Sequence, residues 1–300
     1  MNFEQISYQK HENSYKGEKN NSGAIAHYSN WFDNYTVDLW RHLGMFSVLN
    51  PLLEDKPDSK WITIGDGQFG TAATYIEKKG SKATAIDIDD TLLQIAFEKK
   101  MIKQYKKCNA EALPFENSFF DYSYCKQSYH HFPRPFVALY EMIRVSKYAV
   151  VLTEPADWIP LPIVGSILQK IKRGLKTILG KTNIHHDTGN YEPDGNYVFT
   201  ISEREIEKIA VALNFPAIAY KRYNDIYIQG VENKMYNKTE PLLKKIKQIA
   251  FIRKIKENFG LQRPNNIQMI IFKTQPSENV ITKLKKQKYK YVSLPKNPYL

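Results

Sequence analysis

The chain has 300 residues, of which 42% are hydrophobic, and this is enough apolar material for one large α/β domain or two small ones. Its 43 Lys and Arg exceed its 31 Asp and Glu, and the formal net charge of +12 favours anionic partners such as nucleic acid, glycans or membrane surfaces. The two cysteines lack zinc-ligand spacing, and neither a secretion signal nor an apolar run long enough to cross a bilayer is present, so we expect a cytoplasmic protein without a metal site.

The first half of the chain predicts a nucleotide-binding type of domain. Residues 1–24 are polar, which predicts a flexible N-terminal arm with order beginning near Ile25. Aromatic residues at helical spacing follow, and between residues 61 and 154 short apolar runs alternate with helical patterns over 71–79, 91–100 and 136–144. This alternation is typical of βαβ units, and it predicts a doubly wound, Rossmann-like α/β fold with a mostly parallel sheet.

The second half interrupts this alternation and then resumes it. We expect an insertion over residues 155–200, made of a basic amphipathic helix at 162–181 and a polar loop. A helix follows with Ser202 and Glu205 in capping-box spacing. A second basic helix at 240–257 and a last strand complete a domain over residues 25–275, and residues 276–300 read as a basic C-terminal tail.

A glycine loop followed by an acid marks the predicted site. The stretch WITIGDGQFGTA, residues 61–72, places Gly65, Gly67 and Gly70 between a strand and a helix. There the first glycine permits a tight turn, the second lets the backbone approach a ligand and the third allows close helix packing. Asp87 ends the next strand, about 20 residues further on, where a carboxylate can accept from both hydroxyls of a ribose. These residues predict a nucleoside site that suits NAD or S-adenosylmethionine.

The segment CNAEALPFENSFFDYSYCKQSYHHFPRP, residues 108–135, separates these two cofactors. With the glycine loop and the strand ending AIDID, it resembles the class I S-adenosylmethionine-dependent methyltransferases of the type 11 branch, which carry a D-A-x-x-L-P-F element followed by F-D and an H-H-F turn. The resemblance extends over about residues 58–156. It implies a seven-stranded sheet with an antiparallel last strand, an inserted helical lid and S-adenosylmethionine as the cofactor.

The resemblance also implies which residues bind this cofactor. It places the carboxylate of Asp87 on the ribose, the glycine loop beside the methionine part, and Asn109 at the adenine, where the family usually has Asp. The residues concerned are Gly65, Gly67, Gly70, Asp87, Ile88, Asn109 and Ala110.

Two residues depart from the family pattern. Many relatives have an acid where this chain has Thr63, and Asp66 is expected either to replace it at the cofactor's amino group or to be a solvated turn residue. Lys126 follows a strand that should end beside the cofactor, where a cation is unfavourable near a sulfonium unless an anion intervenes. That anion would be the cofactor's carboxylate or an acidic substrate, and the alternative is a lysine that reaches solvent.

Methyl transfer is an in-line displacement in which a dedicated base is optional. His130 is the first candidate for a base, although the paired histidines could equally be structural. The further candidates lie at strand ends or in the inserted loop: Tyr129, Glu154, His185 and His186.

We therefore expect transfer of a methyl group to an O or N atom of a small-molecule or glycan acceptor, anionic and sugar-like or lipid-linked, with peripheral membrane contact through the basic helices left open. An RNA or protein methyltransferase is the alternative within the enzymes, and nucleic acid is less favoured because no RNA-binding module is visible. A non-catalytic nucleotide-binding protein or a nicotinamide-dependent reductase is the alternative outside the methyltransferases. The oligomeric state is not predicted.

Overall fold

The structure is a computed structural model, which describes residues 3–299 except residues 14, 18, 30, 158, 160, 162–164, 166, 168–190 and 192–196. The first predicted basic helix and the loop that contains His185 and His186 therefore lie outside the described residues. No helix in the described part of the chain is long and apolar enough to span a membrane.

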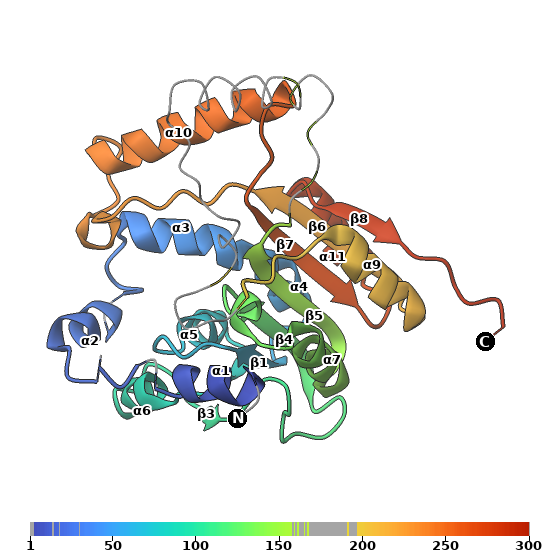
Figure 1. Cartoon of the computed structure of the whole chain (residues 1–300), viewed down its shortest axis with the longest axis horizontal. Helices are drawn as coiled ribbons and strands as arrows, with labels where there is room; N and C mark the ends of the chain where they lie inside the picture. Colours follow the sequence, from blue (N-terminus) through green and yellow to red (C-terminus); the bar gives the residue numbers. More distant parts are fainter. Residues whose placement is uncertain are drawn as a thin grey trace.

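A single sheet forms the centre of the described structure (Figure 1). Its eight strands follow the order β3-β2-β1-β4-β5-β7-β6-β8. Neighbouring strands are parallel in the first part of this order, which contains β3, β2, β1, β4 and β5. Strand β7 is antiparallel to both β5 and β6. The predicted Rossmann-like sheet is confirmed. The strand bounds are β1 Lys60–Ile64, β2 Lys82–Asp87, β3 Tyr105–Lys107, β4 Phe120–Lys126, β5 Ser146–Pro155, β6 Ala217–Tyr223, β7 Asn266–Phe272 and β8 Lys290–Ser293.

Helices cover both faces of the sheet, because successive strand residues point to opposite sides. Trp61 belongs to an apolar cluster with residues of α4, α5 and α11, whereas its neighbour Ile62 belongs to a second cluster with residues of α7 and α9. The helix bounds are α1 Phe3–His11, α2 Ser22–Ser29, α3 Val37–Phe46, α4 Asn50–Asp55, α5 Thr71–Lys78, α6 Thr91–Glu98, α7 Pro135–Val145, α9 Glu203–Ala212, α10 Pro241–Asn258 and α11 Glu278–Lys286.

Both ends of the chain differ from the sequence-based expectation. Residues predicted as an arm with order from Ile25 include helix α1 and the start of α2, and the predicted C-terminal tail includes α11 and β8. Strand β8 pairs antiparallel with β6 and extends the expected seven strands to eight. The many lysines of α11 suggested a solvent-exposed tail. One side of this helix is nevertheless apolar, and Val280, Ile281 and Leu284 on it are buried in the domain.

The local signals in the second half are confirmed. Ser202 and Glu205 form both hydrogen bonds of a capping box at the start of α9. The second basic helix is α10, which packs Leu243 and Ile246 against Val37 and Ile226. Figure 1 shows α10 beyond α3, on the side of the molecule that faces the carboxyl ends of the parallel strands.

Candidate active site

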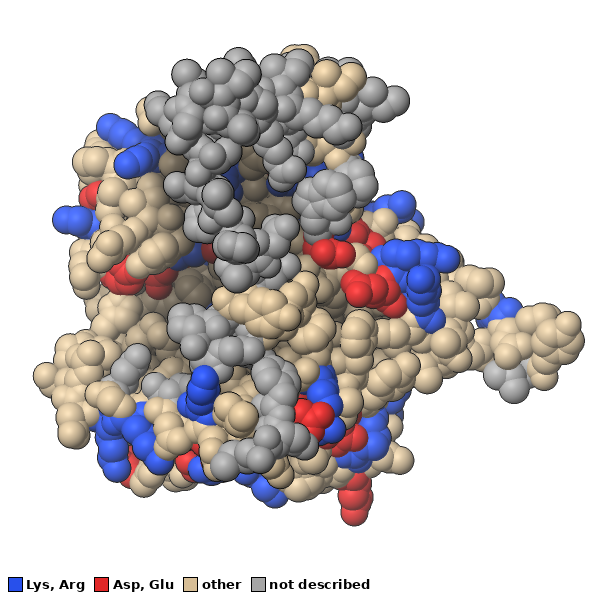
Figure 2. All heavy atoms as spheres, viewed as in Figure 1, with Lys and Arg blue, Asp and Glu red and all other residues tan. Residues whose placement is uncertain are grey.

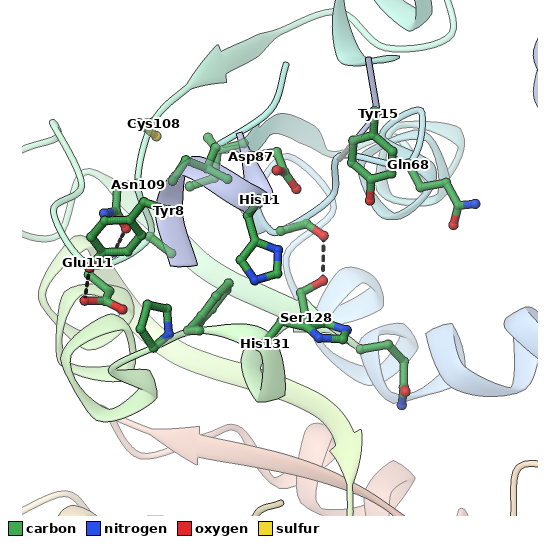
Figure 3. Close-up of a pocket in the computed structure, with 17 residues that line it drawn as sticks. Tyr8, His11, Tyr15, Gln68, Asp87, Cys108, Asn109, Glu111, Ser128 and His131 are labelled. Carbon is green, nitrogen blue, oxygen red and sulfur yellow. Dashed lines mark hydrogen bonds between the residues drawn. The ribbon is translucent and has the colours of Figure 1, made fainter. Parts of the chain in front are cut away.

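A cavity of about 300 Å³ lies where the parallel strands end (Figure 3). Its position follows from the order of the sheet, because the ends of β1, β2 and β4 meet where the chain crosses from one side of the sheet to the other. Five of the residues that the sequence predicted for cofactor binding line this cavity: Gly65, Asp87, Ile88, Asn109 and Ala110.

The Asp87 carboxylate is one of two carboxylates that line this cavity, with Glu111. Its Oδ2 accepts from the backbone N–H of Gly67 at 2.9 Å, and its Oδ1 accepts from that of Asp89 at 3.0 Å. Burial raises the pKa of Asp87 to about 6, even though these two hydrogen bonds favour the charged form. A partly buried carboxylate that accepts only backbone N–H groups has unused acceptor positions for a polyhydroxylated ligand.

The glycine loop needs its first two glycines for steric reasons. Gly65 has φ +65°, and a Cβ at this position would lie 2.4 Å from Cβ of Ser128. A Cβ on Gly67 would lie 2.5 Å from Oδ2 of Asp87, so a side chain there would break the bond between loop and carboxylate. Gly70 precedes α5 and packs on Ile102, away from the cavity.

Asp66 lies in the glycine loop, and its carboxylate accepts hydrogen bonds from nearby residues. Its Oδ2 accepts from Oγ1 of Thr63 at 2.8 Å and from N of Ala73 at 2.9 Å, and its Oδ1 accepts from N of Ala72 at 3.1 Å. The carboxylate thus satisfies N–H groups in the first turn of α5, where negative charge is favourable. The contact of Asp66 with the cofactor's amino group stays a prediction; in this structure both carboxylate oxygens are used within the loop, and the residue does not line the cavity.

The N-terminal segment closes the cavity, which the sequence did not predict. Tyr8, His11 and Tyr15 lie along it in Figure 3. The Tyr8 hydroxyl donates to Oε2 of Glu111 at 2.6 Å, and Arg134 Nε donates to the same oxygen at 2.6 Å. The backbone N–H of Tyr15 donates to Asp89, next to the end of β2. The aromatic residues of this segment were the sequence signal for a contact with the site. The polar composition of the segment instead led to the prediction of a flexible arm.

We compared the chain with known proteins. Residues 62–152 match a family model described as a methyltransferase domain. A ubiquinone/menaquinone biosynthesis C-methyltransferase, UbiE, from Rhizobium etli (strain CIAT 652) is 32% identical over 117 residues, which are 36% of this chain and 44% of that protein. The matched residues 62–152, which contain the glycine loop, Asp87 and the NAEALPF segment, are thus similar to a methyltransferase domain. The match covers less than half of the Rhizobium protein, so the activity of that protein is not established for this chain.

Solved methyltransferase structures are similar to this chain at low identity. A SAM-dependent methyltransferase from Archaeoglobus fulgidus has a TM-score of 0.46 and 16% identity, and covers 78% of this chain and 94% of its own. The YcgJ protein from Bacillus subtilis has a TM-score of 0.46 and 17% identity, and covers 77% of this chain and 99% of its own. The motifs whose resemblance implies S-adenosylmethionine as the cofactor lie within the residues that match the family model.

The turn after β4 contains two of the predicted catalytic residues, Tyr129 and His130, and a third, Glu154, contacts this turn from β5. Glu154, at the end of β5, is fully buried and accepts from the backbone N–H groups of Ser128 and Tyr129, each at 3.1 Å. Its other oxygen lies 2.7 Å from Nδ1 of His130. Neither Glu154 nor His130 lines the cavity, so in this geometry the pair anchors the turn.

The remaining predicted residues of this region also lie away from the cavity. Tyr129 is 2% exposed and packs in the apolar core, and burial raises the pKa of its phenol above the ordinary value. Lys126 is directed toward α3, where its Nζ lies 3.3 Å from Nδ1 of His42. The cavity is instead lined by Gln127, Ser128 and His131, and the Ser128 hydroxyl donates to the carbonyl of Gly65 at 2.6 Å.

Proposed function

We propose that this chain transfers a methyl group from S-adenosylmethionine to an O or N atom of a small-molecule acceptor. The observation that carries the proposal is the partly buried Asp87 carboxylate, which lies in a cavity that the glycine loop and the NAEALPF segment both line. The cavity volume of about 300 Å³ is at the lower end of the range of small-molecule sites.

The residues of the cavity fit this cofactor. The ribose hydroxyls would supply the donors that Asp87 lacks, and the apolar side chains of Ile88 and Ala110 would flank the adenine. Asn109 Oδ1 accepts from N of Glu111 at 2.9 Å and retains a second lone pair for the adenine amino group. The bound cofactor would supply an electrophilic methyl group on a sulfonium. The chain would hold it, orient it and exclude water, which is most of what an in-line displacement requires.

A second cavity supports a small acceptor. It has a volume of about 500 Å³ and lies between α3, β6 and α10, with apolar walls that include Trp40, Leu43 and Ile246. Its charged residues are Lys221, Arg41 and Asp225, and Arg41 forms an ion pair with Asp225 at 2.6 Å, so Lys221 is the cation left for an anionic group. Its wall continues toward the first cavity, because Gln127 Nε2 donates to Oδ1 of Asn266 at 2.9 Å and Asn266 pairs with Tyr223, which lines the second cavity. We propose that an acceptor with an apolar part and an anionic group binds there, which suits a lipid-linked or glycosidic molecule.

The surface charge favours this reading over nucleic acid. On the face seen in Figure 2, the Lys and Arg side chains of the described residues lie among Asp and Glu and do not form one continuous basic surface. Binding along a phosphate backbone depends on such a surface. The same view shows a recess between the part that carries α10 and the body of the molecule.

Helix α10 supports peripheral contact with an anionic membrane. Its inner face is buried, yet its outer face exposes Phe251 at 67% and Ile252 at 50%, and Phe259 just after the helix is 71% exposed. Lys245 and Lys256 lie beside this apolar strip at helical spacing. A surface helix with an apolar strip between lysines is typical of interfacial helices. We propose that it docks on anionic lipid and brings the second cavity close to the bilayer.

Two measurements test the proposed function. Calorimetric titration should show binding of S-adenosylmethionine and S-adenosylhomocysteine but not of NADPH, and the reverse result would contradict the proposal. Transfer of a labelled methyl group from S-adenosylmethionine should then be followed into lipid, glycan, small-molecule, RNA and protein fractions. Label in RNA or protein alone would contradict the small-molecule acceptor. Trp40→Ala should reduce transfer while leaving cofactor affinity unchanged.

The membrane contact has its own test. Co-sedimentation should occur with vesicles of phosphatidylcholine that contain phosphatidylglycerol and not with phosphatidylcholine alone, because the lysines supply the attraction. Phe251→Ser should reduce sedimentation. Phe97→Ser, which removes another exposed ring (47%), is the matched control and should not. Equal sedimentation of the two variants would contradict a role for α10.

A further inference from the structure

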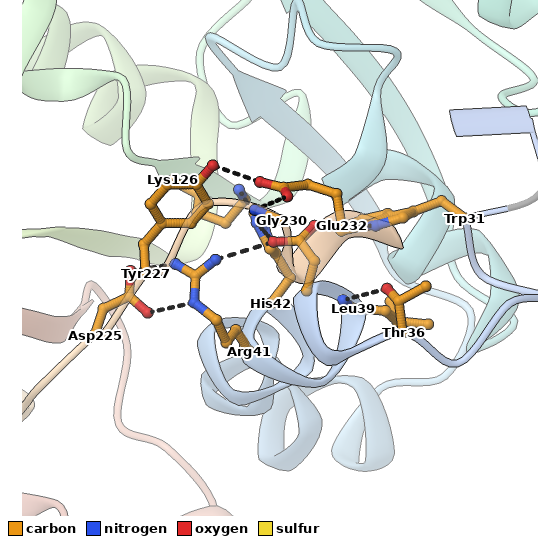
Figure 4. A network of polar contacts seen from close by, with 11 residues as sticks. Trp31, Thr36, Leu39, Arg41, His42, Lys126, Asp225, Tyr227, Gly230 and Glu232 are labelled. Carbon is orange, nitrogen blue, oxygen red and sulfur yellow. Dashed lines mark hydrogen bonds and ion pairs between the residues drawn. The ribbon is translucent and has the colours of Figure 1, made fainter. Parts of the chain in front are cut away.

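Lys126, the last residue of β4, carries a partly buried amine whose surroundings the proposed cofactor site does not explain (Figure 4). Its Nζ lies 3.3 Å from Nδ1 of His42 and 5.5 Å from the centre of the Phe46 ring. In the part of the chain that the structure describes, no carboxylate forms an ion pair with this amine. A partly buried lysine with three donors and one neutral hydrogen-bond partner is costly in its charged form.

His42 is held in the neutral form that can accept from Lys126. Burial, Lys126 and Arg41 together lower the pKa of His42 well below its ordinary value. The other ring nitrogen, Nε2, lies 3.6 Å from Oδ1 of Asp38. Asp38 also accepts from Nη1 of Arg41 at 2.9 Å and from Nε1 of Trp31 at 3.2 Å. A ring whose Nε2–H faces Asp38 presents the Nδ1 lone pair to the amine of Lys126.

Burial and the surrounding charges act on the pKa of Lys126 in opposite directions. Burial lowers the pKa of Lys126 below its ordinary value, against the opposite effect of carboxylates on every neighbouring element. These groups are Asp66 after β1, Glu154 on β5, Asp38 on α3 and Asp225 after β6. A bound sulfonium would lower the pKa of Lys126 further, because two cations in a region of low dielectric constant repel each other.

Lys126 adjoins residues of both cavities, although its own side chain lines neither. The next two residues, Gln127 and Ser128, line the cofactor cavity, and Arg41, beside His42 on α3, lines the second cavity. Figure 4 shows Lys126 and His42 next to the Arg41 and Asp225 pair. An acceptor in the second cavity would meet the methyl group on this side of β4, whereas His130 is turned to Glu154.

We propose that Lys126 is the catalytic proton acceptor of the methyl acceptor, and that His42, backed by Asp38, is a positioning residue that fixes its amine. This inference rests on the proposed function. The acceptor's O or N atom forms a bond to the methyl carbon as the carbon–sulfur bond breaks, and the bonding pair stays on sulfur. The proton of the acceptor passes to Nζ of Lys126. One cationic sulfonium and one neutral amine become one neutral thioether and one ammonium, so charge and atoms balance.

The proposal is tested by cofactor binding without any acceptor. S-adenosylmethionine carries the sulfonium charge and S-adenosylhomocysteine does not, so the ratio of their affinities reports the charge on Lys126. Calorimetric titration of wild-type protein should show this ratio rise at least about twofold from neutral to alkaline pH as Lys126 loses its proton. Because the amino groups of the ligands titrate in the same range, Lys126→Met provides the reference curve, which should lack the additional rise.

Two further variants complete the test. Lys126→Arg keeps the cation at all pH values and should lower the affinity ratio without the additional pH dependence. Lys273→Met removes another half-buried lysine, whose Nζ donates to the carbonyl of Ile143 at 2.7 Å at the opposite edge of the sheet, and should behave as wild type.

The outcomes separate this inference from the proposed function. Equal pH dependence of the ratio in wild type and Lys126→Met would overturn the role of Lys126, and equal curves for wild type and Lys126→Arg would do so even if Lys126→Met fails to fold. Absence of S-adenosylmethionine binding would instead overturn the proposed function. Once an acceptor is known, His42→Asn should lower kcat and shift the pH profile while KM for the acceptor stays the same.

Discussion

The pKa of Asp87 makes cofactor affinity dependent on pH in a way that can be calculated. A ribose hydroxyl donates to the charged carboxylate, so protonation competes with binding. With a pKa of about 6, the carboxylate is almost fully charged at neutral pH and about one-tenth charged at about pH 5. The affinity for S-adenosylhomocysteine should therefore fall about tenfold between these pH values, about 1.4 kcal/mol. Calorimetric titration measures this directly, and an affinity that stays constant to about pH 5 would refute the reasoning.

The same carboxylate should weaken the cofactor-free fold. A pKa raised from 3.8 to about 6 means that folding holds the acid in a less favourable charged state. The cost is fully present above about pH 6, where it amounts to roughly 3 kcal/mol, and disappears below the unfolded value. Asp87→Asn removes the charge but places an amide N–H₂ against a backbone donor, which costs about 1 kcal/mol. The net expectation is a gain of about 1–2 kcal/mol in the free energy of unfolding.

The decisive result is that one substitution changes binding and stability in opposite directions. Asp87→Asn should weaken S-adenosylhomocysteine at least about tenfold at neutral pH while stabilising the free protein in urea denaturation. The exposed Asp58 provides the matched control, and Asp58→Asn should change neither quantity. A variant of Asp87 that binds as wild type, or that lowers the free energy of unfolding, would show that the carboxylate is a structural anchor.

Three other substitutions test the remaining parts of the site. Tyr8→Phe removes the hydroxyl that attaches α1 to Glu111 and should lower the affinity for S-adenosylhomocysteine, measured by calorimetry, about three- to tenfold. The control Tyr299→Phe, at a position 93% exposed, should leave this affinity unchanged. Equal affinities of the Tyr8 variant and wild type would contradict closure of the cavity by α1. Asp66→Asn should lower the free energy of unfolding in urea by about 1 kcal/mol with affinity kept within about twofold, and loss of binding at full stability would support its predicted cofactor role. Glu154→Gln should lower the free energy of unfolding by about 2–3 kcal/mol, because one amide oxygen cannot accept all the hydrogen bonds that the carboxylate accepts from the 128–131 turn. Unchanged stability would contradict the role of Glu154 in holding this turn.

Short-range signals were sufficient for most of the fold. The alternation of apolar runs and helical patterns predicted the parallel sheet, and the capping box at Ser202 marked the start of α9. Gly65 and Asp87 were found in the sequence because a tight turn and a strand-end acid are local requirements of a nucleotide site. Each of these features depends on residues close together in the chain.

The roles of polar side chains could not be predicted in the same way. Asp66 and Lys126 both stand beside the glycine loop and the strand end in the sequence, yet Asp66 turns into the first turn of α5 and Lys126 turns to His42 on α3. The direction of a side chain depends on which partner the folded chain brings near. The N-terminal segment was missed for the same reason, since Tyr8 is ordered by Glu111, a partner 103 residues away.

The sequence by itself determined the sheet, the glycine loop and the position of the nucleoside-type site, because strand periodicity, glycine sterics and the spacing to Asp87 are fixed along the chain. The tertiary structure alone decided which polar groups face the ligand and which hold the protein together. Glu154 and Asp66 looked available in the sequence, but burial removes water from a carboxylate and obliges it to accept from the nearest N–H groups. Within the described residues, Lys126 has a histidine as its hydrogen-bond partner and no carboxylate in an ion pair, and that difference makes it the candidate for chemistry.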